Sequence, residues 1–462
     1  MNWTISDILA SEGFSAQFSG KKKRLKQDIH SIKIDSRKVA DGDIFVAVKG
    51  ERFDAHDFLD DVFANGALAA VVNTSWWRKH QSEMPDCAFL IVNDTLDALQ
   101  KIARAYRRLL SPKIIALTGS NGKTTTKEMI ANVLAMKYKF HKTEGNLNNH
   151  IGVPLTLLAM KPGVELAVVE MGTNHFGEIE KLCEIAEPDL GVITNIGKAH
   201  TEFLQDIDGV RRAKGELFEA IAETGAACVN IDDPNVVQAA RDAKPRKEIT
   251  YGFNAAADIR GENLHLGDDG CARFECENMK FRVGVPGLHN AGNALAVLAL
   301  VRYFEIDFEI AQQKLNEPVA VSGRMRKLKI GGRIVIDDAY NANPESVRAA
   351  FEFLSAFLCA GARIAVLGDM LELGEQAIED HRAVLEYGLA HDNIECIMVH
   401  GKLMSAAFKK LDGKRDRLIF FAEKSRIAHH LMKTTKSGDA ILIKGSRGAK
   451  MEDVLAEFEK MV

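Results

Sequence analysis

The sequence predicts an α/β protein of three domains: a small α/β domain, a central domain with a mostly parallel sheet, and a C-terminal Rossmann-like domain. Three observations support this fold class. The chain has 462 residues, too many for one core when domains run to about 100–200 residues. Short β-branched apolar runs alternate with segments of helical periodicity. Two proline-containing breaks interrupt this alternation, so we place the domains at 1–110, 111–318 and 319–462.

The N-terminal segment reads as a small α/β unit. A β-branched and aromatic run lies at 44–48, and 67–72 has the composition of a second buried strand. A helical pattern covers 95–110 and ends at Ser111, because the residue before a proline disfavours the helical conformation. The first domain boundary is therefore expected there.

The central segment opens with a strand, a glycine turn and a helix, at 113–118, 119–122 and 123–136. Strand, glycine loop and helix in this order form a phosphate-binding unit, so we expect a P-loop-type ATPase domain. Further apolar strands, separated by helical periodicity such as 210–221, lie at 166–171, 190–194 and 227–230. Strands connected by helices build a parallel sheet covered on both faces. The alternating stretch 255–285 is expected to add antiparallel strands to this sheet.

The C-terminal segment repeats the alternation of strands and helices. A helix at 290–303 closes the central unit, and the pattern restarts after Pro318. Strands are expected at 334–336, 363–367, 396–399, 418–421 and 440–443, with helices at 346–358 and 378–389. A Rossmann-like domain is the simplest arrangement of these elements.

Composition excludes several classes of function. The formal charge of −4 and the pI near 6.4 remove the broad positive field that nucleic-acid binding needs. The seven cysteines are scattered without a Cys-x-x-Cys pair, which suits free thiols in a reducing compartment. The sequence begins without a signal-peptide pattern, and its longest apolar run, 294–301, is far below the ~20 residues of a membrane span. We expect a cytoplasmic protein that binds no nucleic acid and inserts into no membrane.

The segment TGSNGKTT, residues 118–125, carries the sharpest chemical signal. Its glycines let backbone amides approach phosphate oxygens, Lys123 offers an ammonium group to the outer phosphates, and Thr124 places a hydroxyl on Mg²⁺. The glycine spacing is two residues shorter than in the common P-loop, and a chance glycine turn is the alternative. The residues assigned here to ATP are Gly119, Ser120, Asn121, Gly122, Lys123, Thr124 and Thr125.

Two residues at strand ends complete a metal site in this interpretation. Glu170 stands at the end of the apolar run 166–169, and His200 follows the strand at 190–194. Ligands of open α/β sheets lie beyond the carboxyl ends of the strands, so both side chains should emerge at one edge with Thr124. A solvated carboxylate and a structural histidine are the alternatives.

The residues leave the reaction open. There is no Gly-x-Ser-x-Gly elbow and no recognisable Cys/His pair, so a covalent enzyme intermediate has no support. A triphosphate site without a side-chain nucleophile favours direct phosphoryl transfer to a bound substrate. An ATP-dependent transferase, a ligase and a nucleotide switch all fit.

The short glycine loop resembles the ATP loop of the Mur ligases and folylpolyglutamate synthetases, and the resemblance runs over essentially the whole chain. Four further segments resemble the Mur ligases: 144–154 (EGNLNNHIGVP), 170–175 (EMGTNH), 338–344 (DAYNANP) and 367–374 (LGDMLELG). The last domain lacks the Asp-Asn-Pro-Arg signature of the diaminopimelate-adding members. The resemblance therefore implies a ligase that joins D-alanyl-D-alanine to UDP-N-acetylmuramoyl-tripeptide through an acyl phosphate, in peptidoglycan synthesis. Other Mur ligases and a folylpolyglutamate synthetase are the alternatives among enzymes.

The resemblance also implies roles for residues and domains. ATP and Mg²⁺ are the implied cofactors, and the chain is expected to act as a monomer. Asn290, Arg324 and Asp338 are implied to contact ATP, so the nucleotide site would be split between two domains that close. Without the resemblance, Asn290 would read as a helix N-cap and Arg324 as a surface charge.

The remaining implied residues concern the substrate and the metal. Ser36, Arg37 and the segment 50–58 are implied to hold the UDP group in the first domain, and Asn148 and Asn149 to contact or order the muramyl-peptide site. Lys214 is implied to be carbamylated, which would convert its cation into a metal-binding anion. Read alone, Lys214 is a helix-surface lysine paired with Glu216 or Glu219. The catalytic set is thus Lys123, Glu170, His200 and Lys214, and the metal set exchanges Lys123 for Thr124.

Overall fold

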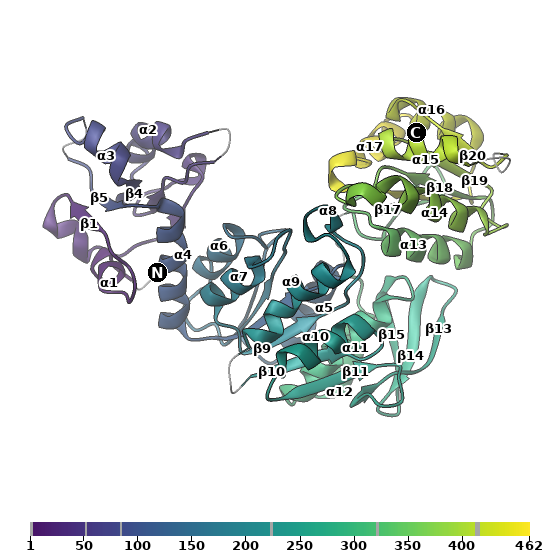
Figure 1. Ribbon diagram of the computed structural model, residues 1–462, viewed down its shortest axis with the longest axis horizontal. Coiled ribbons are helices and arrows are strands. Elements are labelled where there is room, and N and C mark those ends of the chain that lie inside the picture. Colours follow the sequence, from purple (N-terminus) through teal and green to yellow (C-terminus); the bar gives the residue numbers. More distant parts are fainter. Residues whose placement is uncertain (1–2, 51–52, 84–85, 222–224, 320–322, 412–415) are drawn as a thin grey trace.

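The computed structural model describes residues 3–50, 53–83, 86–221, 225–319, 323–411 and 416–462. Its strands form four sheets in three α/β domains (Figure 1). The predicted fold class is confirmed. None of the helices in these ranges combines the length and the apolar character that crossing a membrane would require.

The N-terminal domain contains a five-stranded sheet of order β1-β5-β4-β3-β2. All neighbours are parallel except β1 and β5. The strands are β1 Gln17–Ser19, β2 Ile32–Lys33, β3 Ile44–Val46, β4 Ala69–Asn73 and β5 Phe89–Val92. The helices are α1 Ile5–Leu9, α2 Leu59–Ala64, α3 Thr74–His80 and α4 Thr95–Leu110, with 3₁₀ turns η1 Lys22–Lys26, η2 Ser36–Lys38 and η3 Ala55–Phe58.

Helix α4 joins the first domain to the second. It begins where the Asp94 carboxylate accepts hydrogen bonds from the amides of Leu96 and Asp97, an N-cap that satisfies two otherwise unpaired donors. The Tyr106 hydroxyl donates to the carbonyl of Met160 over 3.0 Å. A single apolar cluster runs from α1 through α4 into the central domain. The first two domains therefore share one core.

The central domain contains a parallel seven-stranded sheet of order β12-β11-β10-β9-β6-β8-β7. Its strands are β6 Lys113–Thr118, β7 Phe140–Lys142, β8 Leu166–Glu170, β9 Leu190–Ile193, β10 Ala226–Asn230, β11 Glu248–Gly252 and β12 Ile259–Arg260. Its helices are α5 Lys123–Leu134, α6 Gly152–Leu158, α7 Glu178–Ala186, α8 Thr201–Leu204, α9 Ile207–Glu219, α10 Pro234–Ala243, α11 Asn290–Tyr303 and α12 Phe308–Asn316. Alternate residues of β6 enter two different apolar clusters, so both faces of the sheet are covered.

The prediction for 255–285 was wrong in one respect. Antiparallel strands are present, but β13 Glu262–Leu266, β14 Cys271–Cys276 and β15 Met279–Pro286 form a separate three-stranded sheet. Phe274, Phe281 and Val283 of this sheet pack into the cluster that contains α11 and α12. Because helices cover its apolar face, the hairpin sheet is stabilised by packing and does not pair with the edge of the large sheet.

The C-terminal domain contains a mixed six-stranded sheet of order β16-β17-β21-β18-β19-β20. Only β16, which the sequence pattern did not predict, is antiparallel to its neighbour. The strands are β16 Arg326–Ile330, β17 Arg333–Asp338, β18 Arg363–Leu367, β19 Cys396–Val399, β20 Leu418–Phe420 and β21 Ala440–Lys444. The helices are α13 Pro344–Ala356, α14 Ala377–Leu389, α15 Lys402–Lys410, α16 Lys424–Thr434 and α17 Glu452–Lys460, with 3₁₀ turns η4 Gly374–Gln376 and η5 Arg447–Ala449.

Helix α11 is packed in the apolar core of the central domain. A substitution in this helix therefore tests the assigned fold. The Leu298 side chain is fully buried. Leu298→Ala should lower the free energy of unfolding by ~2–5 kcal/mol, because it removes buried methyl groups and leaves a cavity. Urea unfolding would measure this loss. The control Leu109→Ala, at a side chain that is 54% exposed, should change stability by less than ~1 kcal/mol. Equal losses in both variants would contradict the assigned core.

Candidate active site

Three loops meet at the carboxyl edge of the central sheet. Strand β6 lies between β8 and β9 and is parallel to both. The loop 119–122 follows β6, Glu170 ends β8, and the loop 194–200 follows β9. In a parallel sheet the carboxyl ends of the strands lie at one edge, where ligands of open α/β sheets bind.

The glycine loop leaves no space for side chains at its two glycines. Gly119 and Gly122 both have positive φ, at 148° and 82°, a conformation that glycine adopts without steric cost. A Cβ on Gly119 would lie 1.9 Å from the Thr194 hydroxyl oxygen, and one on Gly122 would lie 2.5 Å from Oδ1 of Asn293. The loop also contacts the segment that follows β9, because the amide of Asn121 donates to Oδ1 of Asn195 over 2.9 Å.

Lys123 begins α5 directly after this loop. Its Nζ donates to the carbonyl of Gly119 over 2.6 Å. Desolvation lowers the pKa of Lys123 to about 8, while the charge of Glu170 opposes this shift and that of Arg324 adds to it. Thr124 and Thr125 follow in the first turn and are buried. The helix N-terminus, the lysine and the threonine hydroxyl thus converge on one place, as phosphate binding requires.

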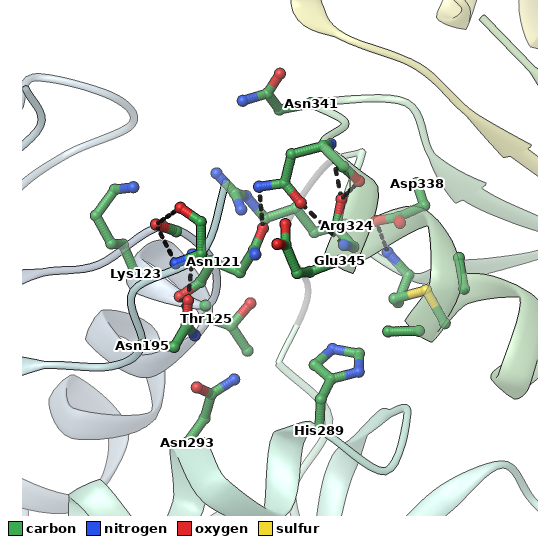
Figure 2. Close-up of a pocket in the computed structure, with 18 of the residues that line it drawn as sticks. Asn121, Lys123, Thr125, Asn195, His289, Asn293, Arg324, Asp338, Asn341 and Glu345 are labelled. Atoms are coloured by element: carbon green, nitrogen blue, oxygen red, sulfur yellow. Dashed lines mark hydrogen bonds between the residues drawn. The ribbon is translucent and has the colours of Figure 1, made fainter. Parts of the chain in front are cut away.

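A cavity of about 330 Å³ lies between the central and C-terminal domains. Figure 2 shows Asn121 and Lys123 on one side and Arg324 and Asp338 on the other. Ser120, Gly122, Thr125 and Asn290 also line it. The structure therefore places most residues predicted to contact ATP around one space formed by two domains.

Two asparagines of α11 lie at the floor of this cavity. Asn290 donates from Nδ2 to the carbonyl of Pro286 over 2.7 Å and is the first residue of α11, so it is no N-cap. Asn293, one turn later, donates to Oδ1 of Asn290 over 2.9 Å. The sequence reasoning missed Asn293. Its position three residues after Asn290, on the same helix face, was the available signal.

The C-terminal wall of the cavity is built from strand ends. Arg324 lies over the ring of Tyr340, 4.3 Å from its centroid, so it is no isolated surface charge. Asp338 at the end of β17 accepts from Lys444 Nζ over 2.6 Å. Lys444 ends the adjacent parallel strand β21 in register with Asp338, and it was also missed. Residues 320–322, just before Arg324, lie outside the described residues.

Side chains from the two domains contact each other beside the cavity. Asn343 Nδ2 donates to Oδ1 of Asn121 in the glycine loop over 2.9 Å. The amide of Lys198 donates to the Glu345 carboxylate over 3.1 Å. The phosphate loop and the C-terminal domain are thus joined by polar contacts, as a site split between closing domains requires.

Glu170 is the last residue of β8 and lies at the carboxyl edge of the central sheet. It is only 1% exposed. Its Oε1 accepts from Nδ2 of Asn148 over 2.9 Å, while its Oε2 has no hydrogen-bond partner among the described residues. A buried carboxylate oxygen without a donor is costly unless a cation completes it. Asn149 is exposed, and its Oδ1 accepts from the amide of Gly152 over 2.9 Å, so Asn149 orders its own loop while Asn148 ties that loop to Glu170.

His200 emerges at the same edge but contacts the last domain. It has a left-handed backbone (φ 58°) just before α8, and its Nδ1 pairs with the carboxylate of Glu372. Glu372 lies in the segment 367–374 and was not singled out from the sequence. No group of three His, Cys, Asp or Glu side chains within the described ranges is arranged to hold a metal ion. Glu170 and His200 therefore do not converge into a preformed cluster.

Lys214 is buried in the middle of α9, with 1% of its surface exposed. In the part of the chain that the structure describes, it has no hydrogen bond or ion pair. Glu216 cannot be its partner, because the Glu216 carboxylate accepts from the amides of Gly177 and Glu180 instead. Burial, followed by the charge of Lys123, lowers the pKa of Lys214 well below its ordinary value. The surface-lysine alternative does not describe this residue.

The residues predicted to hold the UDP group lie on the N-terminal domain, away from the cavity. Ser36 and Arg37 form η2, and the Arg37 guanidinium pairs with Asp35 at 2.8 Å while staying 85% exposed. In the segment 50–58, His56 is buried between Asp54 and the amide of Asn73. Residues 51 and 52 of this segment lie outside the described residues.

Fold and site together define a three-domain α/β protein with a glycine loop of phosphate-binding type at a cavity between two domains. Models of the "Mur ligase family, catalytic domain", the "Mur ligase middle domain" and the "Mur ligase, glutamate ligase domain" match residues 28–107, 117–301 and 323–447. This chain belongs to the Mur ligase family of ATP-dependent peptide ligases.

Two relatives that match nearly the whole chain carry the same name. The UDP-N-acetylmuramoyl-tripeptide–D-alanyl-D-alanine ligases of Bacillus subtilis (strain 168) and Escherichia coli (strain K12) are 37% and 36% identical, over 93% and 94% of both chains. MurF from Acinetobacter baumannii has a similar structure, with a TM-score of 0.88 and 31% identity over 99% of each chain. The MurF ligase from Thermotoga maritima, crystallised in complex with ADP, has a TM-score of 0.80 at 31% identity, covering 93% of this chain and 97% of that one.

The position of Lys123 gives a test of the site. Lys123→Ala should lower kcat by at least ~10²–10³-fold, because it removes a cation that stabilises charge developing on a transferred phosphoryl group. The melting temperature should stay close to that of the parent, since the side chain adds little to the core. Phosphate-release kinetics and thermal unfolding would measure both. More than about a tenth of the parent activity would contradict the role of Lys123.

Proposed function

We propose that this ligase joins D-alanyl-D-alanine to the peptide of UDP-N-acetylmuramoyl-tripeptide, with ATP converted to ADP and phosphate. The observation that carries the proposal is the identity of 36–37% to ligases of that name over nearly the whole length of both chains. The absence of the Asp-Asn-Pro-Arg signature supports the same substrate. The activity would serve peptidoglycan precursor synthesis in the cytoplasm.

The reaction proceeds in two steps. The terminal carboxylate of the tripeptide attacks the γ-phosphorus of ATP, and ADP leaves with the electrons of the broken bond. The amine of D-alanyl-D-alanine then attacks the carbonyl carbon of the acyl phosphate, loses a proton and displaces phosphate. No enzyme side chain becomes bonded to the substrate, so the protein acts by orientation and charge stabilisation.

The cavity residues divide this work. Lys123 and the amides of the glycine loop neutralise the phosphates. Asn290 contacts the adenine, Arg324 the phosphates and Asp338 the ribose. Because these residues come from two domains, the site is complete only while the domains are in contact. One chain supplies all of them, which supports a monomer.

The residues at the sheet edge fit a divalent cation. Among the described residues Glu170 presents a buried oxygen without a hydrogen-bond donor, and the Thr124 hydroxyl lies at the start of α5. His200 follows the neighbouring strand β9 and would have to turn from Glu372 to reach the same cation. Carboxylate and hydroxyl oxygens are the ligands that Mg²⁺ prefers. When bound, Mg²⁺ would neutralise charge on the phosphates and the acyl phosphate.

Lys214 fits the carbamate proposed for it. A buried amine that has no counter-ion among the described residues and whose pKa is lowered by burial loses its proton more readily than an ordinary lysine, and its neutral form can attack CO₂. The product is an anion, which completes the metal set of Thr124, Glu170, His200 and Lys214. An ammonium group at this place would instead repel the metal.

The first domain is proposed to hold the UDP end of the substrate. Ser36 and Arg37 lie on an exposed turn, where a hydroxyl and a guanidinium can bind a diphosphate. Asn148 and Asn149 order the loop beside Glu170, on the side from which the peptide carboxylate must arrive.

Steady-state phosphate release tests the function. With UDP-N-acetylmuramoyl-tripeptide and Mg-ATP, release should depend on added D-alanyl-D-alanine, and the pentapeptide should form with equal stoichiometry. A nucleotide switch would bind ATP without forming this product. Release that is insensitive to the dipeptide would contradict the proposal.

The carbamate has a separate test. Lys214→Ala should lose most of the activity and regain part of it in excess acetate, because a free carboxylate can replace the lost anion. Lys181→Ala, at an exposed lysine of α7, should behave like the parent with or without acetate. Full activity of Lys214→Ala, or a dead variant without rescue whose parent shows a plain lysine in metal-bound crystals, would contradict the carbamate.

A further inference from the structure

Lys127 is a buried charge that the sequence reasoning left without a role. It lies on α5 one turn after Lys123, and its exposed fraction is 0%. A lysine is almost never fully buried unless it is paired. Its partners therefore indicate what it does.

The ammonium group of Lys127 is held between two carboxylates and a loop. Its Nζ donates to the carbonyl of Gly145 over 3.2 Å. It lies 3.4 Å from Oε1 of Glu128 and 3.6 Å from Oε2 of Glu170. The Gly145 contact fixes the ammonium group in place, because it ties Nζ to the loop that also carries Asn148.

The contact with Glu170 is electrostatic. Oε2 is the oxygen that no described donor satisfies, and at 3.6 Å the ammonium group lies beyond a normal hydrogen bond of 2.7–3.2 Å. Attraction between unit charges at this distance remains large in a protein interior. Lys127 thus balances the charge of Glu170 while Oε2 keeps its coordination free.

The surrounding charges alternate in sign from the surface to Glu170. Lys142, at the end of β7, pairs with Glu128 at 2.5 Å, and Glu128 contacts Lys127, which contacts Glu170. Side-chain exposure falls along this row from 31% at Lys142 to 2% at Glu170. The row holds two cations and two anions, so the buried end is neutral without any metal.

We propose that Lys127 is a resident counter-cation of Glu170 that weakens the binding of Mg²⁺ alone. It holds the buried carboxylate in place by charge attraction when no metal is bound. Its charge also repels a metal ion that arrives without ATP, whose phosphates would outweigh that repulsion. The Glu170 site therefore binds the metal–nucleotide complex in preference to Mg²⁺ alone. This inference rests on the proposed role of Glu170 as a metal ligand.

Thermal unfolding of the full chain, titrated with MgCl₂ without nucleotide at constant ionic strength, tests the proposal. Lys127→Met keeps the length of the side chain and removes the charge. The Mg²⁺ concentration that gives half of the stabilisation should fall at least about tenfold relative to the parent, because a cation a few ångströms from the metal is gone. Lys127→Arg should match the parent within about twofold, since it keeps the charge. Lys161→Met, at an exposed lysine, is the matched control and should also match.

A second variant decides the matter if Lys127→Met does not fold. Glu128→Gln leaves Glu170 as the only carboxylate in contact with Lys127, so the half-saturating Mg²⁺ concentration should rise severalfold. If Lys127→Met melts earlier but keeps the parent's Mg²⁺ dependence, Lys127 is only structural and the inference fails. An unchanged Mg²⁺ dependence in Glu128→Gln would overturn it as well.

The same titrations with ATP present separate this inference from the proposed function. Stabilisation of the parent by Mg-ATP that Glu170→Gln abolishes supports the metal ligand. If the parent gains nothing from Mg²⁺ beyond ATP alone, the metal site itself is wrong. If the metal site holds and Lys127→Met is unchanged, only the counter-cation role is lost.

Discussion

The site depends on the position of β6 between two parallel neighbours. This order brings the carboxyl ends of β8, β6 and β9 together at one edge, and each end carries a different chemical group. The connections after β6 and β9 also pack closely against each other, since Thr194 fills the space where Gly119 would have a Cβ. A change in strand order would separate the phosphate loop from Glu170, whatever residues the loops contained.

Burial at this edge gives lysines of the same type different chemistry. Lys123 stays partly accessible beside the cavity and can meet an anion. Lys127 is enclosed by carboxylates and remains a fixed charge. Lys214 is enclosed without a side-chain partner among the described residues, and burial lowers its pKa. The helix that carries a lysine and the groups around its amine, more than the residue type, determine its role.

Local patterns explain which parts of the structure were predictable. The strand, glycine loop and helix at 113–136 are contiguous in sequence, and Glu170 ends an apolar run, so both could be located without a structure. Lys444 contacts Asp338, and Glu372 contacts His200. In each pair more than 100 residues of sequence separate the two partners. The burial of Lys214 depends on how α9 packs, which one lysine in a helical pattern cannot reveal. The detached hairpin sheet likewise depends on α11 and α12 covering its face.

The contacts between the first two domains differ in chemistry from those between the central and C-terminal domains, which form the cavity-side joint. The first and second domains share a continuous apolar core through α4, and opening such a joint would expose hydrocarbon to water. The described contacts of the cavity-side joint include polar ones, as between Asn121 and Asn343 and between His200 and Glu372, beside the rings of Phe353 and Phe357, which lie against Gly270. The polar contacts are hydrogen-bonded pairs. Water can replace each of these bonds at little net cost. Separating the central and C-terminal domains therefore breaks contacts that water can partly replace, whereas separating the first two domains would divide one continuous apolar core.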